Sequence, residues 1–261
     1  MNYGFIGFGN LAKAIHQGLK NDKKLNFGYI SKTSKHKGIK NFDSLQKLVL
    51  FADVIFLCVK PKDAESILKQ LKNINMKNKI LVSPVAGKTI KFIERYTSKN
   101  AAIIRIMPNL AIAHRKSVTA YCYNNFIFNN NDSLKLADKV EKGLSELGTT
   151  VKLQESKFDL FTAIFGSGPA FLLEIMKVLQ KKTNQLKLSG AHADDSLIAL
   201  LEGTALYFKN NKSKSLNQLV KAITSKGGTT EAGLKYYKNK NLDRSLGNMI
   251  EIARKKSKQL N

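Results

Sequence analysis

Several features that mark other classes of protein are scarce or missing in this chain of 261 residues. Its two cysteines, Cys58 and Cys122, are isolated, so the sequence predicts neither a disulfide framework nor a metal site. Cys58 lies within an apolar run, where we expect an inert core thiol. The N-terminus has no basic start followed by a long apolar run, so we expect no secretory signal. A reduced, cytoplasmic setting fits these absences best.

Long apolar runs are also missing, since none approaches the roughly 18 residues that a membrane-spanning helix needs. The sequence contains no Gly-x-Ser-x-Gly elbow, no Walker loop and no His-Glu-x-x-His motif. No ligand-like spacing relates its histidines, which are His16, His36, His114 and His192. We therefore expect no membrane partner and no metal, and chemistry that is carried by a bound cofactor.

Acidic residues are few, because 19 Asp and Glu stand against 44 Lys and Arg, for a net charge of +25. Such an excess is one mark of nucleic-acid binding. Here, however, the lysines are spread along the whole chain, often with asparagines among them, as in Lys238–Asn241. A general compositional bias gives the same pattern. We expect no nucleic-acid partner, and we expect the charge to attract anionic ligands by steering.

Apolar runs and helical patterns alternate over roughly the first 150 residues, which is typical of a parallel, doubly wound sheet. The runs are Tyr3–Gly7, Phe27–Ser31, Asp53–Val59, Ile80–Val85, Ala101–Met107, Val118–Tyr123 and Thr150–Leu153. Helical segments lie between them at Asn10–Lys20, Asp43–Phe51, Ala64–Leu71, Thr89–Tyr96 and Asn131–Leu147. From about Glu155 onward only helical patterns occur. We predict an α/β chain with a Rossmann-type nucleotide domain at residues 1–154 and an all-α domain at residues 155–261, whose apolar faces suit a core or a second subunit.

A dinucleotide fingerprint of the form Gly-x-Gly-x-x-Ala follows the first apolar run. Gly7 makes the tight turn, Gly9 lets a pyrophosphate approach the backbone, and Ala12 allows close packing of helix on sheet. The context strengthens this short motif, because it ends the first strand and opens the first helix. The alternative is a fortuitous glycine turn.

The end of the second predicted strand indicates which dinucleotide binds. NAD-binding proteins usually carry an acid there, but no Asp or Glu occurs between Asp22 and Asp43. The strand instead runs into Ser31, Lys32 and Thr33, whose hydroxyls and charge suit a 2′-phosphate. We predict NADP(H) as the preferred cofactor, with NAD(H) as the alternative if these lysines only reflect the general basic excess.

Three further strand ends fall at the edge of the predicted sheet where ligands bind. They read Val59-Lys60-Pro61, Ser83-Pro84-Val85-Ala86-Gly87 and Met107-Pro108-Asn109. Lys60 and Asn109 are the polar groups that we expect to face the cofactor. Prolines that only terminate strands are the alternative for each junction taken singly.

A loop rich in glycine and hydroxyl groups precedes a helical pattern at Thr229–Tyr237. Adjacent glycines let the backbone approach a ligand, and a helix N-terminus attracts an anion such as a carboxylate. The loop residues are Ser225, Gly227, Gly228, Thr229 and Thr230. An ordinary Gly-Gly turn with a threonine cap is the alternative interpretation.

Taken in order, these segments resemble the pyrroline-5-carboxylate reductase family nearly from end to end. The resemblance rests on Ile6–Ala12, Phe56–Pro61, Ala86-Gly87, Arg105–Asn109, Gly166–Ala170 and Thr224–Gly233. It implies an NAD(P)H-dependent oxidoreductase that reduces 1-pyrroline-5-carboxylate to L-proline, the last step of proline biosynthesis. It also implies a Rossmann domain and a helical domain that joins subunits into at least a dimer.

The resemblance and the motifs together assign the site residues. For the cofactor they are Ile6, Gly7, Phe8, Gly9, Asn10, Leu11, Ala12, Ser31, Lys32, Thr33, Val59, Lys60, Pro61, Ala86, Gly87 and Asn109. For the substrate they are Ser225, Gly227, Gly228, Thr229 and Thr230. We predict that the Thr230 hydroxyl is the catalytic contact to the ring nitrogen, and that the backbone N–H groups of Gly227, Gly228 and Thr229 hold the carboxylate as an anion nest.

The chain departs from the family pattern at several positions, which alter the shape and rigidity of the pocket without removing a chemical group. Lys226 replaces a proline that is frequent before Gly-Gly, and Phe165 replaces a frequent serine. Further departures are Lys62, Val85, Leu110 and the absence of an acid in Leu219–Lys221. A different imine reductase and a β-hydroxy-acid dehydrogenase are the rival enzymes. The second would use a lysine on the first long helix of the all-α domain, where Lys177 lies only two turns in.

Overall fold

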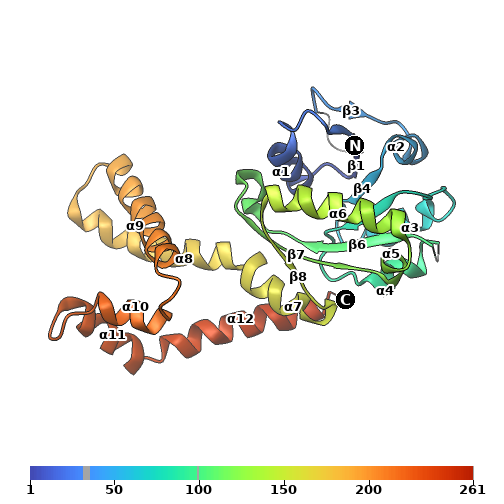
Figure 1. Ribbon diagram of the computed structural model, residues 1–261. Helices are drawn as coiled ribbons and strands as arrows, with labels where there is room; N and C mark the ends of the chain where they lie inside the picture. The colour runs from blue at the N-terminus through green and yellow to red at the C-terminus, as the bar shows by residue number, and fades with distance from the viewer. Residues whose placement is uncertain (32–35, 99, 261) are drawn as a thin grey trace. The chain divides into compact units, whose positions relative to one another are not determined.

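The first half of the chain builds one sheet, of eight strands within the residues that the computed structural model describes (1–31, 36–98 and 100–260; Figure 1). The strands are β1 (Asn2–Ile6), β2 (Asn26–Ile30), β3 (Lys40–Asn41), β4 (Val54–Leu57), β5 (Ile80–Ser83), β6 (Ala102–Met107), β7 (Ser117–Tyr123) and β8 (Gly148–Lys152). Their order across the sheet is β3-β2-β1-β4-β5-β6-β7-β8. The sequence did not predict β3, because its two residues are both exposed and polar.

The strands from β3 to β6 are parallel, but β7 runs antiparallel to β6, and β8 runs parallel to β7. The expectation of a parallel sheet is therefore wrong for the last two strands. The reason lies in the connections. A parallel crossover needs a dozen or more residues, and only the segment 108–116, with the short helix η1 (Leu110–His114), joins β6 to β7. The longer segment between β7 and β8 contains two α-helices and permits the parallel return.

Helices cover both faces of the sheet, which confirms the doubly wound, Rossmann-like architecture. One buried cluster joins the sheet to α1 (Asn10–Leu19), α5 (Asn125–Phe128) and α6 (Asn131–Glu146). The other joins it to α2 (Leu45–Phe51), α3 (Ala64–Leu71), α4 (Ile90–Arg95) and α7 (Phe158–Phe161). Rings of Tyr3, Phe5 and Phe56 on neighbouring strands pack together at the centre of the first cluster. Burial on both faces explains why these strands read as continuous apolar runs.

After β8 the chain is helical, as the sequence predicts. The helices are η2 (Glu155–Lys157), α7, the π-helical segment η3 (Thr162–Gly166), α8 (Gly168–Thr183), η4 (Asn184–Leu186), α9 (Gly190–Asn210), α10 (Leu216–Ala222), α11 (Thr229–Asn239) and α12 (Leu242–Lys258). Two structural units result: Met1–Ser167 with Glu251–Asn261, and Gly168–Ile250. The last turns of α12 therefore belong to the unit that contains the sheet.

The second unit exposes many large apolar side chains on α8 and α9. They are Leu172, Leu173, Ile175, Val178, Leu179, Ile198, Leu200, Leu201, Leu206, Tyr207 and Phe208. The stretch Glu155–Leu186 is long and apolar enough to cross a membrane, with a mean hydropathy of 1.4 in its best window, of which 6% is buried. The expectation that no segment has this length and composition is therefore wrong.

Candidate active site

The first turn of the fingerprint requires glycine at position 7. Gly7 has φ +85°, and a Cβ atom there would lie 2.5 Å from the carbonyl oxygen of Cys58. Its N–H donates to the carbonyl of Ile30 at 2.9 Å, which ties the loop to the end of β2. Burial raises the pKa of the Cys58 thiol, as expected for an inert core cysteine. The turn is thus fixed against two neighbouring strand ends.

The N-terminus of α1 can receive an anion. Gly9 is the N-cap and supplies no side-chain acceptor, and the first internal bond runs from Lys13 N–H to the Gly9 carbonyl. The N–H groups of Asn10, Leu11 and Ala12 thus have no acceptor among the described residues, and the first turn carries no acid. A Cβ at Gly9 would meet nothing within 4 Å, so the backbone is open to a close ligand. These features fit a dinucleotide pyrophosphate.

The other predicted cofactor residues lie at the same edge, because β1, β2, β4, β5 and β6 are parallel and end there. Ser31 follows β2, Val59, Lys60 and Pro61 follow β4, Ala86 and Gly87 follow β5, and Asn109 follows β6. Lys32 and Thr33 lie outside the described residues. Three side chains of the fingerprint face the core instead: Ile6, Phe8 and Ala12 are each at most 2% exposed. Their contribution to a cofactor contact is limited to the backbone.

Asn109 and Gly87 have structural partners that the sequence did not indicate. The Asn109 side chain accepts from Ala111 N–H at 3.2 Å and donates to the Phe165 carbonyl at 3.1 Å. Gly87 has φ +73°, and a Cβ there would lie 2.5 Å from Leu260 near the C-terminus. Glycine is therefore needed at position 87 for packing, whatever it also does for a cofactor.

The predicted substrate loop joins α10 to α11, and two of its three proposed nest donors are engaged within the loop. Gly227 N–H donates to Oε2 of Glu231 at 2.8 Å, and Gly228 N–H donates to the carbonyl of Ser225 at 3.1 Å. A Cβ on Gly228 would lie 2.4 Å from the Ser225 hydroxyl oxygen. Ser225 and Gly228 thus pack tightly, and Ser225 shapes the loop.

The start of α11 keeps its polar groups available. Gly228 is the N-cap without a side-chain bond, and Thr229 and Thr230 are exposed. Within the described part of the chain, neither the N–H groups nor the hydroxyls of these two threonines have a hydrogen-bond partner. The donors that this helix start leaves available are therefore those of Thr229 and Thr230 rather than those of the glycines. Lys226 is exposed beside them and adds a positive charge.

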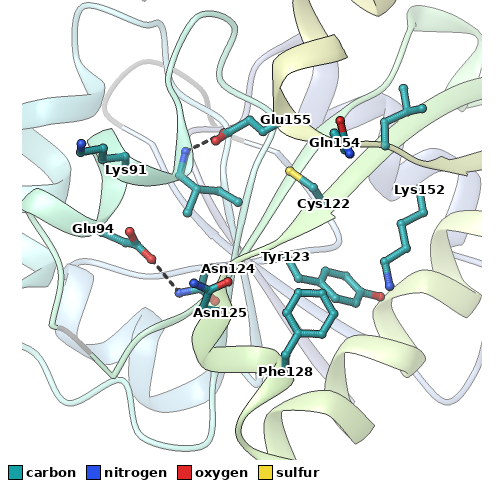
Figure 2. Close-up of a pocket in the computed structure, with 12 residues that line it drawn as sticks. Lys91, Glu94, Cys122, Tyr123, Asn124, Asn125, Phe128, Lys152, Gln154 and Glu155 are labelled. Atoms are coloured by element: carbon teal, nitrogen blue, oxygen red, sulfur yellow. Dashed lines mark hydrogen bonds between the residues drawn. The ribbon is translucent and has the colours of Figure 1, made fainter.

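A separate hollow of about 770 Å³ contains none of the predicted site residues (Figure 2). It lies along β7, β8 and the start of α4, and is lined in part by Cys122, Tyr123, Phe128 and Lys152. Lys152 Nζ lies 4.8 and 5.2 Å from the ring centroids of Tyr123 and Phe128. Burial raises the pKa of the Cys122 thiol to about 12, so that sulfur is not an activated nucleophile. No group of three or more potential metal ligands occurs in residues 1–31, 36–98 and 100–260.

Comparison with known proteins gives a consistent family. A model described as pyrroline-5-carboxylate reductase dimerisation matches residues 155–260, and one described as NADP oxidoreductase coenzyme F420-dependent matches residues 2–87. The pyrroline-5-carboxylate reductase of Aquifex aeolicus is 33% identical, over 100% of this chain and 97% of the relative. That of Staphylococcus epidermidis is 32% identical, over 88% of this chain and 87% of the relative.

The fold agrees over the whole length. The crystal structure of the Plasmodium falciparum pyrroline carboxylate reductase with NADP bound matches with a TM-score of 0.90 at 25% identity, and the match covers 100% of this chain and 98% of that one. A crystal structure of the Streptococcus pyogenes 1-pyrroline-5-carboxylate reductase matches with a TM-score of 0.87 at 26% identity. The family resemblance inferred from the motifs is confirmed: this chain belongs to the pyrroline-5-carboxylate reductase family.

Proposed function

We propose that this chain reduces 1-pyrroline-5-carboxylate to L-proline, the last step of proline biosynthesis, with NADPH as the preferred electron donor. Membership of the family supports the reaction. The N-terminal part of the chain supplies the dinucleotide-binding residues, and the helical part supplies the substrate-binding residues. The nicotinamide ring, when bound, supplies the hydride that the imine carbon accepts. The residues of the chain then have three tasks: to hold the dinucleotide, to hold the substrate anion, and to support the positive charge on the imine nitrogen.

The dinucleotide is held by the loop after β1. The N–H groups of Asn10, Leu11 and Ala12 and the positive end of the α1 dipole receive the pyrophosphate. Gly9 lets that group approach, since nothing lies within 4 Å of where its side chain would begin. Ser31 and the residues after it, including Lys32 and Thr33, receive the 2′-phosphate of NADP(H). Lys60, exposed after β4, adds a cation at the same edge.

The substrate is held by the start of α11. Its carboxylate accepts hydrogen bonds from the N–H groups of Thr229 and Thr230, helped by the dipole of an 11-residue helix. The Thr230 hydroxyl hydrogen-bonds the ring nitrogen, and Ser225, Gly227 and Gly228 fix the loop so that this hydroxyl is presented. Orientation of the two reactants can supply up to ~7–11 kcal/mol of the barrier reduction.

The exposed faces of α8 and α9 are proposed as the subunit interface of at least a dimer. The dimerisation model covers residues 155–260. A second copy of the chain presents the same apolar faces and can bury them. On this interpretation the apolar stretch Glu155–Leu186 packs against protein, and the enzyme works as a soluble cytoplasmic protein without membrane, nucleic acid or metal.

One experiment tests the reaction directly. Purified full-length protein is mixed with NADPH and racemic pyrroline carboxylate, NADPH oxidation is followed by absorbance, and the product is identified as proline. Oxidation without proline formation contradicts the proposal and favours another imine reductase. Oxidation of a β-hydroxy acid with NADP⁺ favours a dehydrogenase. A steep salt dependence of DNA binding, without reductase activity, favours a nucleic-acid role.

A further inference from the structure

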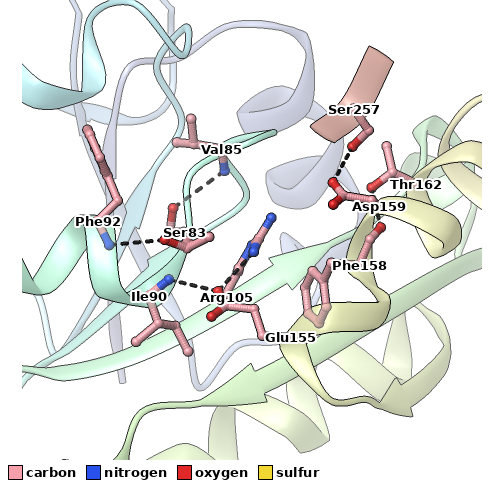
Figure 3. A network of polar contacts seen from close by, with 11 residues as sticks. Ser83, Val85, Ile90, Phe92, Arg105, Glu155, Phe158, Asp159, Thr162 and Ser257 are labelled. Atoms are coloured by element: carbon pink, nitrogen blue, oxygen red, sulfur yellow. Dashed lines mark hydrogen bonds and ion pairs between the residues drawn. The ribbon is translucent and has the colours of Figure 1, made fainter. Parts of the chain in front are cut away.

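The turn between β5 and α4 is held by the segment that follows β8 (Figure 3). Oε1 of Glu155 accepts a hydrogen bond from Ile90 N–H at 2.7 Å and another from Arg105 Nη1 at 2.8 Å. Ile90 is the first residue of α4, so this carboxylate fixes the point where the turn ends. The Arg105 side chain is 6% exposed and that of Glu155 30% exposed, which leaves the pair only partly screened by water.

The Arg105 guanidinium has a second fixed neighbour. Its central carbon lies 4.7 Å from the centroid of the Phe158 ring, three residues after Glu155. Ring and carboxylate come from one short segment and contact one cation. Removing the carboxylate would leave a buried charge without its acceptor, which is far more costly than losing an exposed ion pair. The arrangement therefore holds β6, the start of α4 and the start of α7 in one fixed geometry.

Leu260, two residues after the end of α12, contacts the same turn from another point. A Cβ on Gly87 would lie 2.5 Å from both Cβ and the carbonyl oxygen of Leu260, and Lys88 Nζ donates to that carbonyl at 3.4 Å. The end of α12 is itself anchored, because the hydroxyl of Ser257 donates to Oδ1 of Asp159 at 2.7 Å. Ser257 is 7% exposed. Glu155 and Leu260, from opposite ends of the helical region, thus both contact the turn 84–89 or the helix residue that follows it.

The strand order gives this turn a particular position at the nucleotide edge. The adenosine ribose of a Rossmann-bound dinucleotide lies at the end of the second strand, and its pyrophosphate lies at the first turn. In the order β2-β1-β4-β5, the end of β5 lies on the side of β1 opposite to β2. The nicotinamide half of the cofactor extends to that side. The turn 84–89 contains Ala86 and Gly87, which the proposed function assigns to the cofactor.

We propose that Glu155 and Leu260 are positioning residues that hold the β5–α4 turn in the conformation that receives the nicotinamide half of the cofactor. They act through Ile90 and Gly87 and touch no reacting atom. The inference rests on the proposed function for the identity of the cofactor, and not on the identity of the imine. If these contacts are lost and the turn adopts its binding conformation only about one tenth of the time, the apparent Kd for the whole dinucleotide rises about tenfold.

The test measures binding as well as turnover. NADPH and 2′,5′-ADP, which lacks the nicotinamide half, are titrated calorimetrically into the full-length wild type, Glu155→Ala and Ser257→Ala, which removes the hydroxyl that anchors the segment before Leu260 (with NADH and ADP in their place if NADH binds the wild type more tightly). Glu146→Ala is the matched control for the first variant, because Glu146 pairs with Arg115 at 3.5 Å on the surface. Ser245→Ala is the control for the second, because the exposed Ser245 hydroxyl donates to the Asn241 carbonyl four residues earlier in the chain.

We expect each positioning variant to raise the Kd of NADPH about tenfold and to leave that of 2′,5′-ADP within about twofold, with both controls at wild-type values. KM for NADPH should rise with Kd, while kcat at saturating NADPH changes less. An unchanged Kd for NADPH in folded variants overturns the proposal, and so does an equal loss for both ligands. If Glu155→Ala does not fold, Ser257→Ala decides alone. A wild type that binds NADPH but forms no proline contradicts the proposed function and leaves this inference to be judged by binding.

Discussion

The backbone N–H of Gly227 donates a 2.8 Å hydrogen bond to the carboxylate of Glu231 in the first turn of α11. This contact resembles half of a capping box, in which an acid in the first turn reaches back to the chain before the helix. It holds Gly227 at φ +74°, in the left-handed region that favours glycine. The acid thereby closes the loop on itself and leaves the donors of Thr229 and Thr230 to a ligand.

Glu231 should therefore act through the shape of the loop. We expect Glu231→Ala to raise KM for pyrroline carboxylate by up to about tenfold, because one internal hydrogen bond contributes ~0.5–1.5 kcal/mol. Glu231→Gln keeps an acceptor for Gly227 N–H and should change KM by less than about threefold, so the pair of variants separates shape from charge. Steady-state kinetics measure both. Equal KM increases in the two variants would show that the charge of Glu231 is what matters.

Thr230 should contribute to the reaction itself. We expect Thr230→Ala to lower kcat/KM about tenfold to a hundredfold, because one hydrogen bond to a charged group contributes ~1.5–3 kcal/mol. Thr230→Ser keeps the hydroxyl and should recover most of the activity. Thr183→Ala is the matched control, since the hydroxyl of Thr183 donates only to the Leu179 carbonyl of its own helix. Wild-type kinetics in Thr230→Ala would remove Thr230 from the site.

Gly7 and Gly9 should fail in different ways when replaced by alanine. Gly7→Ala places a methyl against the Cys58 carbonyl at a positive φ, so we expect a lower Tm as well as loss of NADPH binding. Gly9→Ala has room in the protein alone and should cost at most about 1 kcal/mol of stability. It should nevertheless raise the Kd of NADPH at least about tenfold, because the methyl occupies space next to the pyrophosphate.

Calorimetric titration and thermal unfolding of the same two samples check this contrast. Gly203→Ala controls for the effect of adding a methyl group away from the nucleotide loop, because a Cβ there also meets nothing within 4 Å. If Gly9→Ala binds NADPH as tightly as the wild type, the pyrophosphate does not lie against this turn.

The sequence predicted the parts of this molecule that depend on local pattern. Buried strands produce continuous apolar runs, so β1, β5 and β6 were found within about two residues of their ends. The direction of β7 was missed, although the nine residues before it are too few for a crossover. For the candidate site, residues were indicated by the sequence where glycines give a local signal. Leu260 and Glu155 were not, because contacts between residues so far apart in sequence leave no local pattern.

The same reasoning applies to the helical region. The apolar character of α8 and α9 could be read from composition, but burial could not, since a helix that packs on a second subunit has the sequence of a core helix. Their exposure in a single chain, together with the dimerisation model over residues 155–260, supports the proposal that they form an interface.

The preference for NADPH should depend on salt. We expect kcat/KM with NADPH to exceed that with NADH by about tenfold at low ionic strength, because the 2′-phosphate meets Ser31 and the lysine that follows it. The ratio should shrink as NaCl rises toward 1 M, where the Debye length falls to ~3 Å. Lys32→Ala should lower the ratio, and Lys139→Ala on α6 should not. A ratio at or below one in the wild type would contradict the NADP(H) assignment.

The exposed face of α8 should control assembly. Val178 is 64% exposed in the single chain, and Val178→Asp places a charge where we expect a second copy to pack. A twofold interface repeats each change. Since burying one valine contributes ~1.5–3 kcal/mol, the dimer Kd should rise at least about a hundredfold. Sedimentation equilibrium measures this shift, with Leu50→Asp as the control, because Leu50 is equally exposed on α2. An unchanged mass for Val178→Asp, or wild-type protein that co-sediments with lipid vesicles, would instead favour a role for Glu155–Leu186 at a membrane.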